Sequence, residues 1–197
     1  MANNVTPGRW ISMGWAIFKE DIGNFILITL IAGALASVAN FVVAGPLLAG
    51  MFIAVKRRML HGRTDLMDLF AGFNLFVDAF LVGILTAIFT VVGLALCIFP
   101  ALIVAAFYLF AYLFLVDRKL GFWEAMESSR RLVVQDLLGY ILFVFLLLLF
   151  NLLGLILLGV GLLVTIPVSV AAIAVAYKET VGFMTAPVVA AGPVHIP

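Results

Sequence analysis

Apolar residues dominate this chain, and they fall in three long stretches that contain no charged residue. The stretches cover residues 22–55, 79–116 and 137–177, which are 34, 38 and 41 residues long. A single membrane-spanning helix needs about 20 predominantly apolar residues. Each stretch is too long for one span and long enough for two short ones. The pattern therefore predicts an all-α integral membrane protein with about six transmembrane or re-entrant helices.

Residues that break helices fall inside each stretch, at Gly45-Pro46, Phe99-Pro100 and Gly159-Val160-Gly161. Proline removes a backbone hydrogen-bond donor and disfavours helix in the residue before it. Glycine supplies the positive φ that a tight turn needs. We therefore expect the chain to fold back at each break, which gives three helical hairpins.

The first hairpin has alternatives, because only about ten apolar residues separate Pro46 from Lys56. A helix of that length spans about 15 Å, against about 30 Å for the bilayer core. One alternative continues the return arm to about Leu60, with its basic side chains reaching back to the interface. A second makes the arm re-entrant. A third is a single kinked helix from Asn24 to Val55, which would carry the next charges across the membrane.

The charged residues form four clusters at the ends of these stretches, within residues 9–21, 56–78, 117–136 and 178–179. If each stretch is a hairpin, all four clusters lie on one side of the membrane. None of the 11 Lys and Arg residues would then lie on the other side. Because Lys and Arg are enriched in cytoplasmic loops, we expect this side and both termini to be cytoplasmic.

An aromatic-rich amphipathic segment precedes each hairpin, and in the third one Glu127 and Arg131 are spaced to pair at i,i+4. Such helices are suited to lie in the headgroup region, with their aromatic side facing the acyl boundary. The alternative is that each segment is a cytoplasmic extension of a transmembrane helix. The residues on the apolar faces are Trp10, Ile11, Gly14, Trp15 and Phe18, then Phe70, Phe73, Phe76, Val77 and Phe80, then Phe122, Trp123, Met126, Val133 and Leu137.

Each amphipathic segment and the hairpin after it form one architectural unit, without a residue-level repeat. The units lie near residues 9–60, 65–117 and 120–178. They make up a single helical membrane domain over residues 1–182. An extended, proline-containing tail follows at 183–197, and such a segment could dock on a partner.

Composition supports a membrane protein and narrows its chemistry. Hydrophobic residues make up 66% of the 197 residues and charged residues 11%, against about 25% charged in a soluble domain. The net charge of +1 gives no reason to expect a nucleic-acid partner. The single Cys97 excludes an intrachain disulfide and a cysteine-based metal cluster. The polar N-terminus does not resemble a cleaved signal peptide.

The chain carries no pattern typical of an enzyme, a metal site or a cofactor site. His61 and His195 have no nucleophile or carboxylate partner in sequence, so we expect neither catalysis nor a bound metal. No ionisable residue lies deep in a predicted span, and Asp78 and Asp136 fall at predicted interfaces as boundary or helix-start carboxylates. Interhelical hydrogen bonds account best for the polar residues inside the spans, and a polar substrate path is the alternative. The main candidates for intramembrane polar contacts are Asn40, Asn151, Thr86 and Tyr112.

The basic residues are the remaining candidates for a binding site. If they converge in space, they would bind anionic lipid headgroups, with about 1 kcal/mol for each Lys or Arg near the surface. The alternative is that they only mark the cytoplasmic side. The candidate headgroup contacts are Lys56, Arg57, Arg58, Arg63, Arg118, Lys119, Arg130 and Arg131.

Several short runs carry a family resemblance. They are residues 45–50 (GPLLAG), residues 68–73 (DLFAGF), Val116-Asp117, Trp123-Glu124-Ala125 with Ser129, and Gly159-Val160-Gly161 before Pro167 and Tyr177. Over roughly residues 10–182 the chain resembles a large set of small polytopic bacterial membrane proteins of uncharacterised function. That set is similar to the membrane domain fused to some glycerophosphodiester phosphodiesterases. The resemblance implies a bacterial inner-membrane domain of about six helices and no catalysis.

These observations favour a non-enzymatic membrane protein, either an accessory or scaffold subunit or a lipid-associated module. We expect its partners to be membrane lipids, anionic phospholipid among them, and either another protein or a second copy of the chain. The alternative is a transporter or channel for a small or lipid-like solute. A polar cavity that gathers the intramembrane polar residues would favour the transporter.

Overall fold

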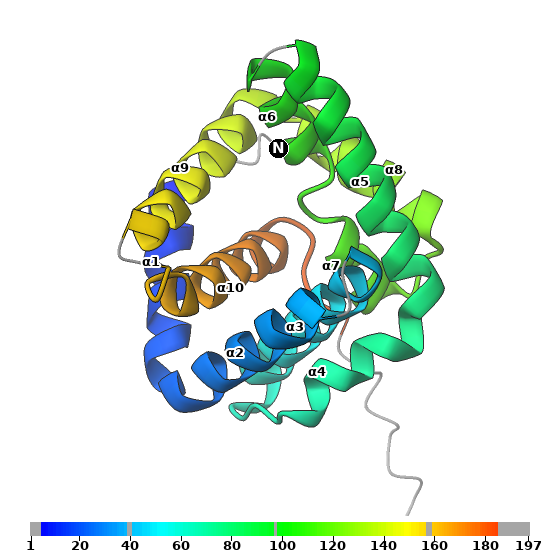
Figure 1. The fold of residues 1–197 in the computed structure, drawn as a ribbon. Helices are drawn as coiled ribbons and strands as arrows, with labels where there is room; N and C mark the ends of the chain where they lie inside the picture. The colour runs from blue at the N-terminus through cyan, green and yellow to red at the C-terminus, as the bar shows by residue number, and fades with distance from the viewer. Residues whose placement is uncertain (1–4, 39–40, 97, 157–158, 185–197) are drawn as a thin grey trace, which may run out of the picture.

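The computed structural model describes residues 5–38, 41–96, 98–156 and 159–184 of the chain (Figure 1). Over these residues the protein is built from helices, with no strand. In chain order the helices are α1 (Pro7–Glu20), α2 (Ile22–Val38), α3 (Phe41–His61), α4 (Met67–Ala71), the 3₁₀ helix η1 (Gly72–Leu75), α5 (Phe76–Leu96), α6 (Ile98–Phe107), α7 (Ala111–Arg118), α8 (Phe122–Val134), α9 (Leu137–Ile156) and α10 (Leu162–Thr180).

Four helical segments are long and apolar enough to cross a membrane. They are Met67–Ala95, Phe99–Arg118, Leu137–Ile156 and Leu162–Thr180, and Ile22–Ala34 is a shorter apolar helix. The first runs from α4 through η1 and α5, so the second aromatic segment continues directly into a candidate span. For that segment the structure favours an extension of a transmembrane helix over a separate surface helix.

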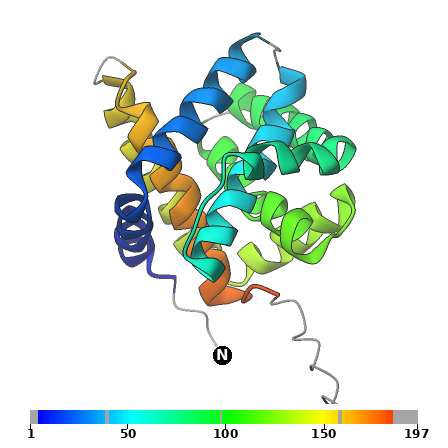
Figure 2. The same ribbon diagram turned by 90° about the horizontal axis from the view of Figure 1, so that it is seen from below.

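Helix α10 lies at the centre of the molecule. It packs against α1, α2, α3 and α9, and Figure 1 shows the other helices arranged around it. In Figure 2, α1 lies on one flank and α4 and α5 lie on the opposite flank. Small side chains allow α10 to occupy this central position, because they let the neighbouring helices approach it closely. The fully buried small residues of α10 are Ala171, Ala172, Ala174 and Ala176.

Part of the predicted interfacial face of α1 is turned toward the protein, because Trp10, Gly14 and Phe18 are buried, whereas Trp15 of the same face is 41% exposed. Trp10 and Phe18 are almost completely buried. The Trp10 ring packs on Tyr140 and Phe143 of α9, with centroid distances of 6.0 and 5.0 Å. A Cβ atom at Gly14 would lie 2.7 Å from the backbone nitrogen of Ala172. The helix is amphipathic because it docks on α10 and α9.

The predicted break at Gly45-Pro46 is wrong in position. Pro46 lies inside α3, which is 21 residues long, so the return arm is twice the predicted length. As the sixth residue of α3, Pro46 lacks the N–H that would bond the carbonyl four residues earlier, yet the helix continues through it. A single kinked helix from Asn24 to Val55 is also wrong, since α2 and α3 are separate helices that pack against each other.

The two other breaks lie close to their predicted positions. Phe99-Pro100 falls in the first turn of α6, where proline is well tolerated. The chain turns between α9 and α10 at Gly159, whose φ of +75° is the left-handed conformation that favours glycine. In both places the two helices that flank the turn pack against each other, α5 against α6 and α9 against α10.

The run GPLLAG at 45–50 meets the run DLFAGF at 68–73 through backbone contact. A Cβ atom at Gly50 would overlap the backbone of Leu69, and one at Gly72 would overlap the backbone of Pro46 and Gly50. Only glycine allows two helices to approach this closely. Two of the short runs noted in the sequence are therefore the two sides of one packing contact.

The candidate span Phe99–Arg118 is interrupted between α6 and α7, and Ser129 of α8 supports the interruption. Its hydroxyl donates a hydrogen bond to the carbonyl of Phe107 at 2.6 Å and accepts one from the backbone N–H of Phe110 at 3.1 Å. Backbone groups released by a helix break at membrane depth need such a partner. Helix α8 is thus fixed to the protein by a buried side, while Trp123 remains exposed.

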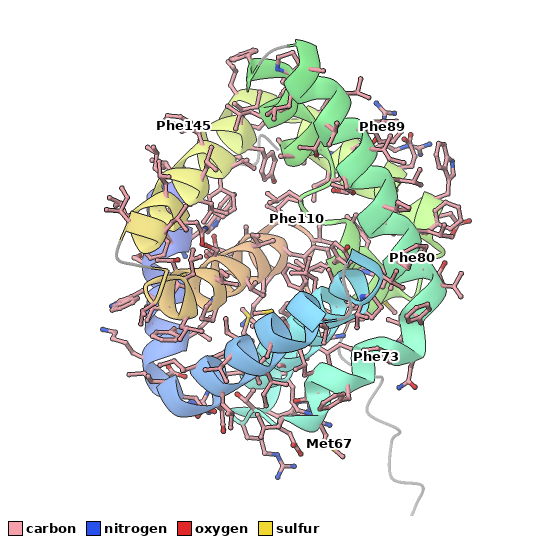
Figure 3. All side chains as sticks on the ribbon, in the orientation of Figure 1. Met67, Phe73, Phe80, Phe89, Phe110 and Phe145 are labelled. Carbon is pink, nitrogen blue, oxygen red and sulfur yellow. The ribbon has the colours of Figure 1, made fainter. Side chains whose placement is uncertain are left out.

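The outer surface of the helices is apolar. Figure 3 shows Met67 on α4 and Phe89 on α5, both of which are exposed, whereas Phe110 points inward. A soluble monomer rarely exposes so extended an apolar surface. The large side chains that remain exposed on α5, α6, α9 and the turn before α10 include Val91, Val92, Leu94, Phe99, Leu138, Leu148, Leu152, Leu153, Leu155, Ile156 and Val160.

Candidate functional site

The charged residues form a polar face in which ion pairs join clusters that are distant in sequence. Arg9 pairs with Glu179 at 2.9 Å, and the Trp10 indole donates to the same carboxylate at 2.6 Å. These contacts join the first cluster to the fourth. Arg58 lies 3.5 Å from both Glu20 and Asp21, which joins the second cluster to the first. The clusters therefore lie together, as the hairpin pattern predicts.

Asp117 is the most heavily engaged group of this polar face. Its carboxylate is completely buried and lies 2.7 Å from the Lys56 ammonium and 3.3 Å from Arg118 Nε. It also accepts hydrogen bonds from the Tyr177 hydroxyl and from the backbone N–H of Met184, both at 3.1 Å. A buried charge is tolerated only with such partners. Asp117 thereby ties α3, α7 and α10 to the segment that follows α10.

Four other carboxylates, Asp65, Asp68, Asp78 and Asp136, accept hydrogen bonds from backbone N–H groups at helix starts. Asp65 accepts from the backbone N–H of Met67, and Asp68 accepts from the backbone N–H of Asp65, which is a capping box. The buried Asp68 also pairs with Arg57. Asp136 caps α9 through Gly139, as predicted for a helix-start carboxylate.

Asp78 acts on a different helix from its own. Its Oδ1 accepts from the backbone N–H of Phe122 at 3.0 Å, so a residue of α5 caps the start of α8. Gly121, which precedes α8, offers no side-chain cap. The carboxylate also suits the positive end of the helix dipole. The predicted boundary residue is therefore a tertiary cap.

Six of the eight predicted headgroup contacts are engaged by acidic residues of the protein. Besides the pairs of Lys56, Arg57, Arg58 and Arg118, both Arg130 and Arg131 bind Glu127 at 2.8 Å. The eight residues thus do not form one convergent basic site. Within the part of the chain that the structure describes, four cations form no ion pair: Lys19, Arg63, Lys119 and Lys178.

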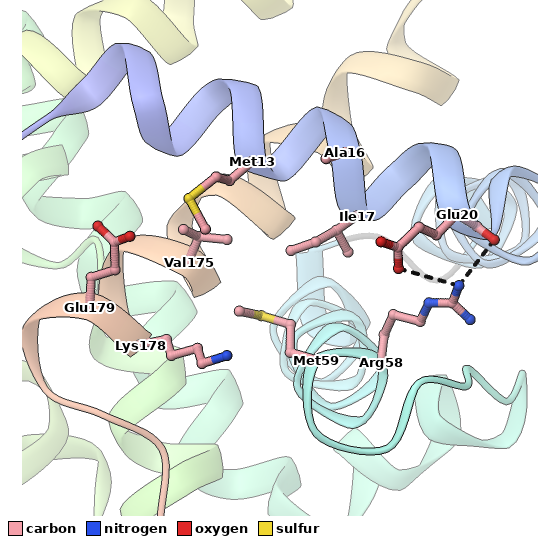
Figure 4. Close-up of a pocket in the computed structure, with 9 residues that line it drawn as sticks. All are labelled: Met13, Ala16, Ile17, Glu20, Arg58, Met59, Val175, Lys178 and Glu179. Carbon is pink, nitrogen blue, oxygen red and sulfur yellow. Dashed lines mark hydrogen bonds and ion pairs between the residues drawn. The ribbon is translucent and has the colours of Figure 1, made fainter.

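A cavity of about 540 Å³ opens on the polar face between α1, α3 and α10, and we call it the Lys178 groove (Figure 4). In Figure 4, Lys178 extends toward Met59 and away from Glu179. Sequence reasoning missed this site, because its residues come from three distant segments and Lys178 stood in a cluster of only two charges. The groove is lined by Met13, Ala16, Ile17, Glu20, Arg58, Met59, Val175, Lys178 and Glu179.

A second cavity, of about 390 Å³, lies between α3, α5 and α7, and we call it the Tyr112 cavity. The Thr86 hydroxyl is buried there without a hydrogen-bond partner among the described residues. The Tyr112 hydroxyl lies against Gly83, where a Cβ atom would be 2.9 Å away. The cavity is lined by Ala44, Gly45, Leu48, Gly83, Thr86, Ala87, Thr90, Val91 and Tyr112.

The four predicted intramembrane polar residues do not share one space. Thr86 and Tyr112 line the Tyr112 cavity, while Asn151 lies elsewhere. The Asn151 amide donates to Ser169 Oγ of α10 at 2.8 Å, which is an interhelical hydrogen bond of the kind favoured from the sequence. It also donates to the carbonyl of Leu147 in its own helix at 2.8 Å. Asn40 lies outside the described residues, as do Cys97 and most of the predicted tail.

Comparisons with known proteins leave the chain without an assigned relative: no protein-family model, no curated protein and no solved structure matches it. The family resemblance stays a prediction. Within the described residues, no group of three or more His, Cys, Asp or Glu side chains could hold a metal ion.

Proposed function

We propose that this chain is a multi-pass protein of the bacterial inner membrane, with no catalytic role, that acts as a lipid-associated module. Its helices pair as α2 with α3, α5 with α6 and α9 with α10. The polar face and both termini lie on the cytoplasmic side. The aromatic side chains Phe70, Phe76 and Trp123, which are exposed close to that face, suit the headgroup boundary.

One observation carries this proposal: charge and exposed apolar surface are separated in space. Ion pairs join all four charge clusters, whereas exposed side chains near the opposite turns are apolar, with Phe99 61% and Val160 68% exposed. A bilayer accommodates this arrangement, because its core solvates the apolar surface and its headgroups solvate the charges. The four cations without an ion pair remain available on this face to contact anionic headgroups.

Cysteine labelling in intact cells tests the orientation. Single cysteines replace Phe99, Val160 or Arg63, in a chain whose Cys97 is changed to serine. A membrane-impermeant maleimide added outside should label Phe99→Cys and Val160→Cys and spare Arg63→Cys until the cells are opened. Labelling of Arg63→Cys from outside would overturn the orientation.

Lipid analysis tests the second part of the proposal. The chain purified in mild detergent should retain anionic phospholipid in excess over its fraction in the host membrane. The matched control is a host membrane protein of similar span number purified in the same way. Equal enrichment in both samples would contradict a lipid-associated role.

A transporter or channel is the second candidate, and the Tyr112 cavity is the observation that favours it. The cavity holds the Thr86 hydroxyl, which is buried at the middle of α5 without a hydrogen-bond partner among the described residues. An aqueous path there would make a cysteine at Thr86 reactive toward a water-soluble maleimide. Reaction as slow as that of a Val92→Cys control, which is exposed on α5 and does not line the cavity, would exclude such a path.

A further inference from the structure

The Lys178 groove combines a lysine that has no ion-pair partner with an apolar wall. Lys178 forms no ion pair with any described residue. The two carboxylates of the groove are already engaged: Glu179 binds Arg9 and the Trp10 indole, and Glu20 binds Arg58. Arg58 is shared between Glu20 and Asp21, so Lys178 is the cation lining the groove that has no carboxylate partner among the described residues. An anionic group would complement this unpaired ammonium.

Arg58 adds a second donor. Its terminal nitrogens bind the carbonyls of Gly62 and Glu20 at 2.7 and 3.0 Å, which fixes the guanidinium at the edge of the groove. Its Nε–H is buried and has no acceptor among the described residues. Guanidinium and ammonium groups together are the donors that phosphate groups prefer in proteins.

The rest of the groove is apolar and lies beside these donors. Met13 and Ile17 of α1, Met59 of α3 and Val175 of α10 form the wall. Methionine and isoleucine side chains suit a flexible hydrocarbon chain. The volume of about 540 Å³ falls within the range of about 300–1,000 Å³ that is typical of small-molecule sites.

We propose that the Lys178 groove binds one anionic phospholipid, with its phosphate at Lys178 and Arg58 and the upper part of an acyl chain against Met13, Ile17 and Met59. This inference rests on the proposed function, because it needs the polar face at headgroup depth. The inference assigns headgroup binding to one groove, whereas the sequence predicted contacts spread over eight basic residues.

Titration with dioctanoyl phosphatidylglycerol, followed by native mass spectrometry of the full chain in detergent, tests this proposal. We expect one lipid to bind, and Lys178→Gln to weaken its binding about fivefold, the equivalent of the 1 kcal/mol that one cation contributes near a membrane surface. Ala16→Leu should weaken it as well, because the larger side chain fills the groove beside an intact Lys178.

Lys19→Gln is the matched control, because Lys19 also lies unpaired in the last turn of its helix but does not line the groove. Equal losses in Lys178→Gln and Lys19→Gln, or no loss in Ala16→Leu, would overturn the site. In that case, lipid enrichment during purification would still support the proposed function. Glycerol 3-phosphate and inorganic phosphate separate a lipid site from a site for free phosphate: binding of either as tight as that of the lipid would also overturn the proposal.

Discussion

Helices α9 and α10 are consecutive and form a pair, yet they occupy opposite environments. The α9 span has the higher mean hydropathy, 2.6 against 1.6, but only 22% of its window is buried, against 61% for α10. Hydropathy therefore does not identify the buried helix of this protein. In lipid, a large apolar side chain gains little by turning inward, whereas small side chains allow close packing of helices. The central helix is the one with alanine and serine.

The largest expected effect concerns the polar end of α10. Asp117→Ala would leave Lys56 and the Tyr177 hydroxyl without their buried partner. Breaking a buried ion pair in this way costs about 3–5 kcal/mol. The midpoint of SDS-induced unfolding, followed by tryptophan fluorescence, measures the loss. Glu124→Ala is a suitable control, since no described residue forms an ion pair with Glu124. Equal shifts in the two variants would mean that Asp117 does not anchor α10.

A pair of leucines on α9 tests the difference between its two sides. Leu147 is 6% exposed and Leu153 is 61% exposed. Leu147→Ala should lower the free energy of unfolding by about 2–5 kcal/mol, because it creates a cavity in the packed core. Leu153→Ala should change it by less than about 0.5 kcal/mol. Similar losses would show that the outer side of α9 is covered by protein.

The next largest loss of stability is expected from disrupting the close contact between α1 and α10. Gly14→Val would place a side chain against the backbone of Ala172 and Val168, at a cost of about 1–3 kcal/mol for overpacking. Gly8→Val is the control on the same helix, because a Cβ atom there meets nothing within 4 Å. Unfolding midpoints of the two variants would be compared under the same conditions. A loss in Gly8→Val as large as in Gly14→Val would point to helix propensity and not to packing.

The hydrogen bond between α9 and α10 should contribute less. Asn151→Leu removes the contact with Ser169 Oγ, and such interhelical bonds average about 0.6 kcal/mol. A double-mutant cycle with Ser169→Ala isolates the pair. Additive losses in the double variant would indicate that the two side chains do not interact.

The smallest effect lies on the surface helix α8 and depends on pH. Hydrogen bonds from Arg130 and Arg131 lower the pKa of Glu127 to about 2, from an ordinary value of 4.5. The contribution of this carboxylate to stability is therefore complete above the ordinary value and is lost as the pH falls toward 2. The difference in unfolding midpoint between the parent chain and Glu127→Gln should shrink over that range. A constant difference would mean that the ion pairs do not stabilise the fold.

The sequence alone predicted the membrane character, the position of the turns after α5 and α9, and the gathering of the charge clusters. These features depend on the order of polar and apolar residues, because a charge cannot remain in the bilayer core without a partner. The same pattern misplaced the first turn. Gly45-Pro46 resembles a break in sequence, but Gly45 lies against the backbone of Ala79 and Pro46 lies inside α3.

Only the tertiary structure decided which residues could bind a ligand. The eight predicted basic residues looked equivalent in sequence, yet six of them have acidic partners of the protein, and Lys178, which was not among them, lines a groove. Whether a charge is free depends on the carboxylates that packing brings within about 4 Å of it, where Coulomb attraction is strong. Those carboxylates are up to 170 residues away in sequence, as for Arg9 and Glu179. Hydropathy determined where the charges gather, and packing determined which of them remain available.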